Sequence, residues 1–300
     1  MKKLFLFAVI FFAFFQTKAQ IDPLKYPTFT DIQEALAAKQ TVYSISFRDK
    51  GIYNVSPEIS KLKNLFFLNL MGNNLEQIDQ EIFLLGSLEI LNINFNNIKF
   101  IPDEIGKLKN LTNFSMNLNQ LVKINDNLAN LQQLKIVQFD ANNITVFPEV
   151  LLKIKGLEEI NLSSNQINFI SHDLSVIENL KYLNLAANQI NDFSNIRLPK
   201  KLKYLELQHN SIVSLSEKLF ESENLEFLNV SDNRIKEIPQ NVKKLKSVVS
   251  MNLANNQLKD LPKEFSRLKN LKTLILAGNP MNNETIEKLK KIMPQTQIYF

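Results

Sequence analysis

Apolar and polar residues alternate in one pattern that recurs along most of the chain. The pattern is LxxLxLxxNxL, as in LKYLNLAANQI at residues 180–190 and LKYLELQHNSI at residues 202–212. Apolar residues at positions one, four and six are spaced as in a short strand, so their side chains enter the interior while the residues between them face outward. The hydrophobic pattern therefore predicts a stack of coils, each with one short strand.

The asparagine at position nine sets the repeat length. Its spacing is 23 residues throughout, except for 22 between Asn188 and Asn210. An amide both donates and accepts hydrogen bonds, so at the inward turn it can satisfy buried backbone groups and form an internal ladder. One unit carries Lys50 instead, which fits a first coil that is covered by a cap. We number the units as coils 1–11, which begin at residues 42, 65, 88, 111, 134, 157, 180, 202, 225, 248 and 271.

The second half of several coils opens with an apolar residue and a proline, as in FIPDEIGKLKNL at residues 100–111. Proline lacks an N–H group, so it is tolerated where a short helical or irregular segment begins. Both halves together resemble the leucine-rich repeat family, in its class of 23-residue repeats, over residues 41–281. The prolines that carry this part of the resemblance are Pro102, Pro148, Pro239 and Pro262.

The resemblance implies an α/β repeat solenoid. Its expected shape is a curved horseshoe of about 11 coils with a parallel sheet on the concave side. The convex side is expected to hold short helical or irregular segments. Neighbouring coils then stack about 4.8 Å apart, so equivalent positions form rows along the sheet.

The first 19 residues differ from the rest of the chain. Two lysines precede an unbroken apolar run at residues 4–15, and the small residues Thr17 and Ala19 follow. This order is typical of a cleaved secretory signal peptide of bacterial type, here residues 1–19. The apolar run is too short to span a bilayer, which takes about 20 residues. We therefore expect a secreted or periplasmic protein without membrane insertion after signal cleavage.

Both ends of the repeat region are predicted to be caps. Residues 20–40 are expected to form an N-terminal helical cap in which Thr30 is the N-cap residue. Residues 282–300 are expected to form a C-terminal cap, with a helix capped by Asn283 and a final strand. The predicted organisation is therefore a signal peptide, a cap, the repeats and a second cap.

The residue inventory narrows the functional classes. The chain has no Cys and two His, so cysteine nucleophiles are excluded and histidine chemistry is confined to two positions. His172 stands beside Asp173 in a return segment, where we expect a solvated side chain. No glycine-rich phosphate loop, HExxH motif or calcium loop occurs. We expect a protein that is not an enzyme and takes no cofactor or metal.

The formal net charge of +5 overstates the basic character of the folded region. Residues 1–19 hold three lysines and no acid, so the remainder carries a net charge of +2. This balance does not favour a nucleic acid partner. Much of the excess of Lys and Arg in residues 200–300 falls in return segments, where a solvated convex face is the expected role and attraction to an anionic envelope polymer is the alternative.

The outward positions three, five and seven define the predicted concave face. Position three carries Tyr182, Tyr204 and Phe227 in successive coils, and exposed aromatic residues are favoured binding anchors. Lateral stacking that merely stiffens the sheet is the alternative role. The remaining predicted contacts are three polar residues beside the aromatic row and three apolar residues elsewhere in position three: Glu206, Gln208, His209, Phe67, Ile90 and Ile136.

Two other rows receive structural interpretations. Position five repeatedly carries asparagine, as at Asn184 and Asn229, which predicts a lateral amide ladder. Position two alternates partly in charge, as at Glu158 and Lys181, which predicts ion pairs between coils.

These features favour a non-enzymatic scaffold that binds a protein or peptide partner through the concave face. A module that binds glycans or a cell-envelope polymer is the first alternative, because aromatic rings also stack on sugars. A structural or adhesin-like envelope protein is the second. The sequence does not choose the partner or the oligomeric state, and fold resemblance supplies the idea of binding only by association.

Overall fold

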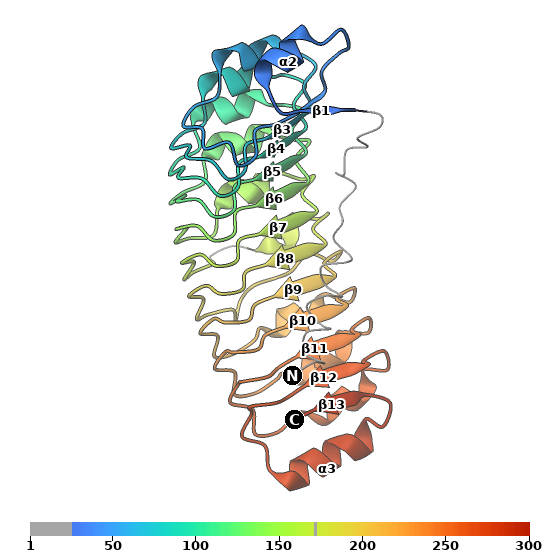
Figure 1. Cartoon of the computed structure of the whole chain (residues 1–300). Helices are drawn as coiled ribbons and strands as arrows, with labels where there is room; N and C mark the ends of the chain where they lie inside the picture. The colour runs from blue at the N-terminus through green and yellow to red at the C-terminus, as the bar shows by residue number, and fades with distance from the viewer. Residues whose placement is uncertain (1–25, 171–172) are drawn as a thin grey trace.

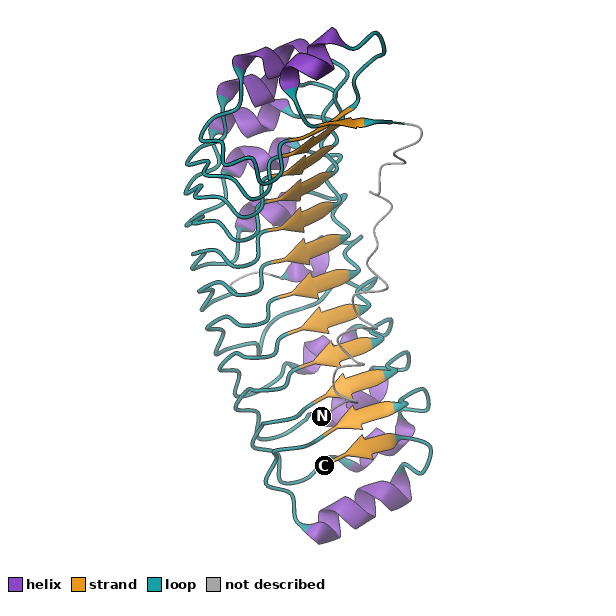
Figure 2. Ribbon diagram, in the orientation of Figure 1, coloured by secondary structure: helices purple, strands orange, loops and turns teal. Residues whose placement is uncertain are grey.

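A computed structural model describes residues 26–170 and 173–300. The chain forms one curved stack in which every strand lies beside the strand that precedes it (Figures 1 and 2). The strands form a 13-stranded parallel sheet in sequence order. The predicted repeat solenoid is therefore confirmed. The predicted signal peptide and His172 lie outside the described residues.

Each coil contributes a strand of three residues at positions three to five. Equivalent positions pair across the whole sheet, as Tyr182 does with Tyr204 and Tyr204 with Phe227. This register turns each outward position into a straight row on the sheet. The strands of the coils are β2 (Ser44–Ser46), β3 (Phe67–Asn69), β4 (Ile90–Asn92), β5 (Asn113–Ser115), β6 (Ile136–Gln138), β7 (Glu159–Asn161), β8 (Tyr182–Asn184), β9 (Tyr204–Glu206), β10 (Phe227–Asn229), β11 (Ser250–Asn252) and β12 (Thr273–Ile275).

The sheet has two more strands than the predicted coils, one at each end. β1 (Thr28–Phe29) pairs with β2, and β13 (Gln297–Tyr299) pairs with β12. Each end also has an α-helix, α2 (Ile32–Ala37) or α3 (Asn283–Ile292). The helices cover the two ends of the stack (Figure 1).

The residues that cap these helices differ by one position from the prediction. Asp31, not Thr30, is the N-cap of α2, and its carboxylate accepts hydrogen bonds from the N–H groups of Gln33 and Glu34 at 2.7 and 3.0 Å. A carboxylate is favoured there because the N-terminus of a helix carries partial positive charge. Asn282, not Asn283, caps α3, and its Oδ1 accepts from the Thr285 N–H at 2.8 Å.

Short 3-10 helices line the convex side, behind the sheet in Figure 2. Pro102, Pro148, Pro239 and Pro262 each directly precede one of them, as the return pattern predicts. No helix is assigned in the described residues between β8 and β9, where the coil is one residue shorter. The 3-10 helices are η1 (Pro57–Lys61), η2 (Gln80–Leu84), η3 (Asp103–Lys107), η4 (Asp126–Asn130), η5 (Glu149–Lys153), η6 (Leu174–Val176), η7 (Glu217–Glu221), η8 (Gln240–Lys244) and η9 (Lys263–Arg267).

The asparagine ladder is present inside the stack. Asn188 Nδ2 donates to the carbonyl oxygens of Leu162 and Leu185 at 3.0 and 3.1 Å, and its Oδ1 accepts from the Ile167 N–H at 2.9 Å. Each such amide thus links its own coil to the preceding one and satisfies backbone groups beside the hydrophobic core. Lys50 is exposed in coil 1, so the predicted exception is confirmed.

Position eight has a backbone conformation that the repeat pattern did not predict. In all 11 coils its φ is positive, between 51° and 77°, although only Gly72 and Gly278 are glycines. The chain turns inward at this residue, and the following asparagine reaches the interior. The residues in this row are Asp49, Gly72, Phe95, Leu118, Ala141, Ser164, Ala187, His209, Asp232, Asn255 and Gly278.

Candidate binding face

The three predicted aromatic anchors lie side by side on β8, β9 and β10. The rings of Tyr204 and Phe227 stack in parallel, with centroids 4.9 Å apart and an interplanar angle of 7°. The Tyr182 and Tyr204 rings are tilted by 51° with centroids 6.3 Å apart. Lateral packing therefore covers part of the row, and all three side chains are half-buried on the concave face.

Glu206 interrupts the asparagine row directly beside these rings. Its exposed fraction is 9%, and Asn229 Nδ2 donates to its Oε2 at 3.4 Å. Burial raises the pKa of the Glu206 carboxyl, while hydrogen bonds from Gln208 and Asn229 act in the opposite direction. A carboxylate can accept about four hydrogen bonds, so Glu206 can still accept bonds from a partner on the concave side.

The predicted lateral amide ladder at position five is wrong. Asn184 Oδ1 accepts a hydrogen bond from the Ala186 N–H, two residues on in its own coil, at 3.0 Å. Asn252 does the same with the Ala254 N–H at 3.1 Å. The side chain is short, so the backbone at the end of its own strand is its nearest donor. These asparagines therefore close their own strands, and a side-chain bond to the preceding coil occurs where a carboxylate is the acceptor, as for Asn161 and Asn229.

Two further carboxylates belong to this face and were missed in the sequence. Gln138 Nε2 donates to Glu159 Oε1 at 3.0 Å, and Asn161 Nδ2 donates to Asp140 Oδ1 at 3.1 Å. Burial raises the pKa of Glu159, and it raises the pKa of Asp140 from 3.8 to about 6. Asp140 and Glu159 thus lie two coils or fewer from Tyr182, on its N-terminal side.

All three carboxylates act electrostatically on the hydroxyl of Tyr182. Burial raises the pKa of its hydroxyl, and the negative charges of Glu206, Glu159 and Asp140 raise it further. Each carboxylate therefore lies close enough to act on the same phenol. We call the set of Asp140, Glu159, Tyr182, Tyr204, Glu206 and Phe227 the acidic aromatic row.

The charges on the concave strands all have one sign in coils 2–11. Positions three, five and seven of these coils contain Asp140, Glu159 and Glu206 and no Lys or Arg. The nearest lysines occupy position two at the rim, where Lys181 pairs with Glu158, and Lys203 pairs with Glu226 at 2.8 Å. The predicted pairing between coils is confirmed for these two lysines. Sorting charges by repeat position would have revealed the acidic face from the sequence.

Of the remaining predicted contacts, Gln208 and Ile136 adjoin this row, whereas His209, Phe67 and Ile90 do not. Gln208 is half-buried, and its Oε1 is buried without a hydrogen-bond partner. His209 is exposed at the turn after β9, with Nδ1 3.8 Å from Asp232 Oδ2. Phe67 and Ile90 pair on β3 and β4, and Phe67 is five strands from β8, or roughly 24 Å at about 4.8 Å per strand. The last predicted contact, Ile136 on β6, borders Glu159.

Metal clusters and membrane-spanning helices are both absent from the described residues. Within residues 26–170 and 173–300, no three His, Asp or Glu side chains are placed to hold a metal ion. In the same part of the chain, no helix has the length and apolar character needed to cross a membrane.

Family models for leucine-rich repeats match the chain at residues 87–108, 132–190 and 223–281. A leucine-rich repeat protein of Leptospira interrogans is 32% identical, with a TM-score of 0.82 over 92% of this chain and 70% of that one. The functional domain of InlJ from Listeria monocytogenes is 22% identical, with a TM-score of 0.70 over 86% of this chain and 53% of that one. The leucine-rich repeat part of FLRT2, in a complex with Latrophilin 3 and Unc5D, is 22% identical. Its TM-score is 0.75 over 86% of this chain and 83% of that one. No curated protein matches the chain significantly.

Proposed function

Because the chain belongs to the leucine-rich repeat family, we propose that it is a non-enzymatic scaffold that binds a protein or peptide on its concave face. Two solved structures of the same fold support a protein partner. The leucine-rich repeat part of FLRT2 occurs in an assembly with two other proteins, and a plant receptor kinase ectodomain occurs in complex with CASPARIAN STRIP INTEGRITY FACTOR 2. These two proteins are similar to this chain in fold, and their partners are not thereby partners of this chain.

The observation that carries the proposal is the acidic aromatic row. Its three carboxylates face the concave side without any Lys or Arg at positions three, five and seven of coils 2–11. A partner segment with a Lys or Arg side chain would place a cation among these acceptors and its apolar stem along the exposed ring edges. The burial of the carboxylates strengthens the attraction, since opposite charges interact more strongly where the dielectric constant is low.

The packing of the rings favours a protein over a glycan. Sugar recognition by aromatic residues uses the open face of a ring, whereas Tyr204 and Phe227 cover one another's facing sides. What these rings offer is chiefly their edges, which suit contacts with side chains and backbone. A purely structural role predicts instead that this row has no effect on binding.

We propose that the partner is met outside the cytoplasm, in a periplasm or in the medium. The order of charged, apolar and small residues in 1–19 supports this location. The mass of the protein recovered from its native cells tests the proposal, because signal cleavage would leave a chain that begins at Gln20.

Selection from a displayed library of random peptides tests the binding function. We expect peptides enriched in Lys or Arg with neighbouring apolar residues, and we expect their binding in fluorescence anisotropy to weaken at least tenfold in Glu206→Gln and in the pair Tyr204→Ala with Phe227→Ala. The matched control is Tyr53→Ala, which removes a 68% exposed tyrosine in coil 1. Selected peptides without basic residues, or equal binding by all variants, would exclude the proposed site.

A further inference from the structure

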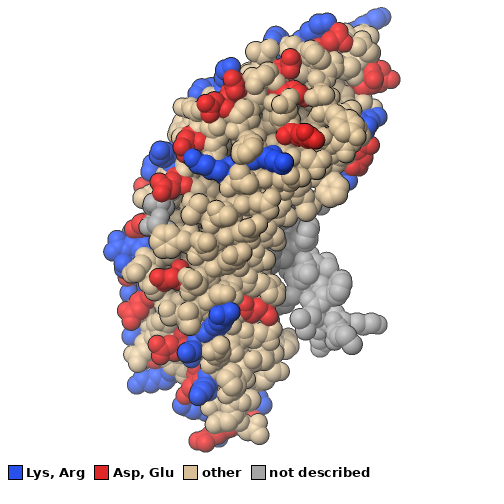
Figure 3. Space-filling view, turned by 90° about the vertical axis from the view of Figure 1, so that its left-hand side faces the viewer, with Lys and Arg blue, Asp and Glu red and all other residues tan. Residues whose placement is uncertain are grey.

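Exposed apolar side chains gather on the flank of coils 3–6, where the chain leaves the strands and turns toward the convex side. Phe100, Val122, Val146 and Phe169 occupy repeat positions 12 and 13 and are exposed by 65, 44, 55 and 52%. This flank faces the viewer in Figure 3, where charged residues gather along one edge and at the ends and leave a broad uncharged area between them. Water-exposed apolar side chains at this density indicate an interaction surface.

Two more apolar residues extend this surface. Phe95 and Leu118 stand at position eight of coils 3 and 4 and are exposed by 58 and 50%. Their left-handed backbone is costly for residues other than glycine, and it turns the side chains out of the stack. We call these six residues the apolar flank: Phe95, Phe100, Leu118, Val122, Val146 and Phe169.

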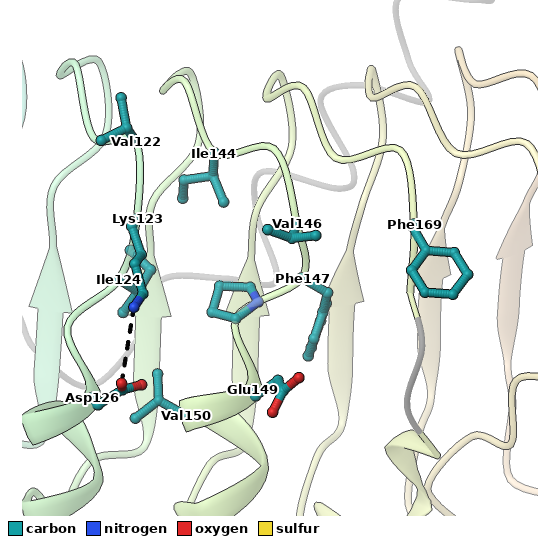
Figure 4. Close-up of a pocket in the computed structure, with 11 residues that line it drawn as sticks. Val122, Lys123, Ile124, Asp126, Ile144, Val146, Phe147, Glu149, Val150 and Phe169 are labelled. Carbon is teal, nitrogen blue, oxygen red and sulfur yellow. Dashed lines mark ion pairs between the residues drawn. The ribbon is translucent and has the colours of Figure 1, made fainter.

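A pocket with a volume of about 320 Å³ opens in the middle of the apolar flank (Figure 4). Val122, Val146 and Phe169 form its walls. Its floor consists of the buried residues Ile124 and Phe147. A cavity of about 150 Å³ already binds benzene, so this pocket has room for one phenyl ring.

A matching projection lies on the same surface. Phe100 belongs to coil 3, and the pocket is centred on coil 5, with walls from coils 4, 5 and 6. A smaller pocket lined by Phe100, Ile101, Lys123 and Ile124 links the two along the flank. The projection and the pocket thus lie equally far from coil 4, on opposite sides of it.

We propose that the apolar flank binds a second copy of this chain. A two-fold axis that lies in the interface beside coil 4, parallel to the flank and at right angles to the direction in which the coils stack, exchanges coil 3 with coil 5. It therefore places Phe100 of each copy in the pocket of the other, which is the reciprocity that a two-fold symmetric interface requires. The occupant is a copy of the same chain because one surface carries both complementary features.

The charges beside coil 4 are compatible with this arrangement. Lys123 Nζ lies 3.9 Å from Asp126 Oδ2, and both side chains are at least 75% exposed at the edge of the pocket. Both residues belong to coil 4, so the same rotation brings the two ion pairs, one from each copy, together beside the axis, where their charges sum to zero. Such exposed ion pairs add little to the strength of an interface.

The area of the flank fits a dimer interface. Its six side chains, with exposed fractions of 44–65%, offer on the order of 600 Å² of apolar surface at roughly 150–200 Å² per side chain. A stable interface buries about 800 Å² per partner, of which roughly two thirds is apolar in a homodimer. The apolar flank and a narrow polar rim supply that amount. The concave faces of both copies stay open, so a dimer would bind partners bivalently.

Sedimentation velocity of the purified protein at 1–100 µM tests the proposal. We expect a concentration-dependent dimer whose dissociation constant rises at least tenfold in Val122→Asp. Val213→Asp is the matched control, because Val213 occupies the same repeat position in coil 8 and has nearly the same exposure, 45% against 44%. A monomer throughout this range, or equal dimers in both variants, would overturn the proposal.

Cysteine cross-linking gives a second measurement that does not depend on a destabilising charge. The chain has no Cys, so Phe100→Cys and Val146→Cys each introduce the sole thiol. We expect a mixture of the two variants to form a mixed disulfide dimer in mild oxidant, because the two positions meet across the interface. Val213→Cys mixed with Phe100→Cys should not. A mixed dimer in the control mixture alone would exclude the two-fold arrangement.

Discussion

The ring of Tyr204 stacks on the ring of Phe227, with centroids 4.9 Å apart and planes that differ by 7°. These residues belong to consecutive coils and pair directly in the sheet. Their contact exists only because the 23-residue repeat places the same position of each coil side by side. Such stacking fixes the two rings as one surface, and it has a measurable effect on stability.

We expect a coupling free energy of about 0.5–1.5 kcal/mol between Tyr204 and Phe227, because parallel rings attract beyond the area that they bury. A double-mutant cycle with Tyr204→Ala and Phe227→Ala, followed by urea unfolding, measures it. The pair Tyr182 and Tyr204 is the control, since its rings are 6.3 Å apart and tilted by 51°. Equal coupling in both pairs would contradict a specific stacking contribution.

The two asparagine rows should differ in their effect on stability. Asn188→Ala removes the hydrogen bonds to Leu162, Leu185 and Ile167 inside the stack, so we expect a loss of roughly 3–5 kcal/mol in the free energy of unfolding. Asn184→Ala removes the bond to the Ala186 N–H and the hydrogen bond with the half-buried Tyr182, and should cost about 1 kcal/mol. Chemical denaturation of both variants checks the difference, and similar losses would contradict a larger contribution from the inner ladder.

Asp140→Asn should stabilise the protein in a pH-dependent way. Burial raises the pKa of Asp140 from 3.8 to about 6, so between these pH values the folded chain holds a proton that the unfolded chain has lost. Stability therefore decreases as pH rises through this window. Removing the charge should raise the free energy of unfolding by about 1–2 kcal/mol at pH 7.5 and by less at pH 4.

Urea denaturation at the two pH values measures this effect. Asp126→Asn is a suitable control, because its carboxyl is 75% exposed and its ion pair with Lys123 is long at 3.9 Å. We expect this control to change stability by less than about 0.5 kcal/mol at either pH. A larger gain for Asp140→Asn at pH 4 than at pH 7.5 would reverse the assigned sign.

Neighbouring alanines should respond to glycine in opposite directions. Ala187 has φ of 52°, which is strained for any residue with a Cβ, so Ala187→Gly should stabilise the protein by about 0.5 kcal/mol after the entropy cost of glycine. Ala186, one residue earlier, lies outside that region and is 6% exposed, so Ala186→Gly should destabilise it by about 1 kcal/mol. Thermal unfolding separates the two, and shifts of the same sign would contradict the strain.

Much of the solenoid architecture could be predicted from the sequence, because it depends on the local alternation of apolar and polar residues. Apolar residues at positions four and six enter the core in every coil, and Asn188 and its equivalents form the predicted inner ladder. The helix ends were misplaced by one residue, since neighbouring Thr30 and Asp31 both have cap chemistry and only the backbone decides between them. The left-handed backbone at position eight was missed because that position carries eight different residue types, among which glycine is a minority.

The candidate site was only partly readable. The stacking order of Tyr182, Tyr204 and Phe227 follows from repeat arithmetic, and the structure has them adjacent. Asp140 and Glu159 were missed because their importance depends on burial, which a single coil does not specify. Whether these residues bind a partner stays a prediction.

By itself, the sequence determined the number of coils, the identity of the inward residues and the rows that the outward residues join, because a strict period fixes all three once the coils stack. Only the tertiary structure decided which outward residues share an environment. Asp140, Glu159 and Glu206 come from different coils, and their shared action on Tyr182 depends on distances across the sheet. Phe100 and the pocket beside Val146 likewise became complementary only when curvature and backbone turns had set their separation along the flank.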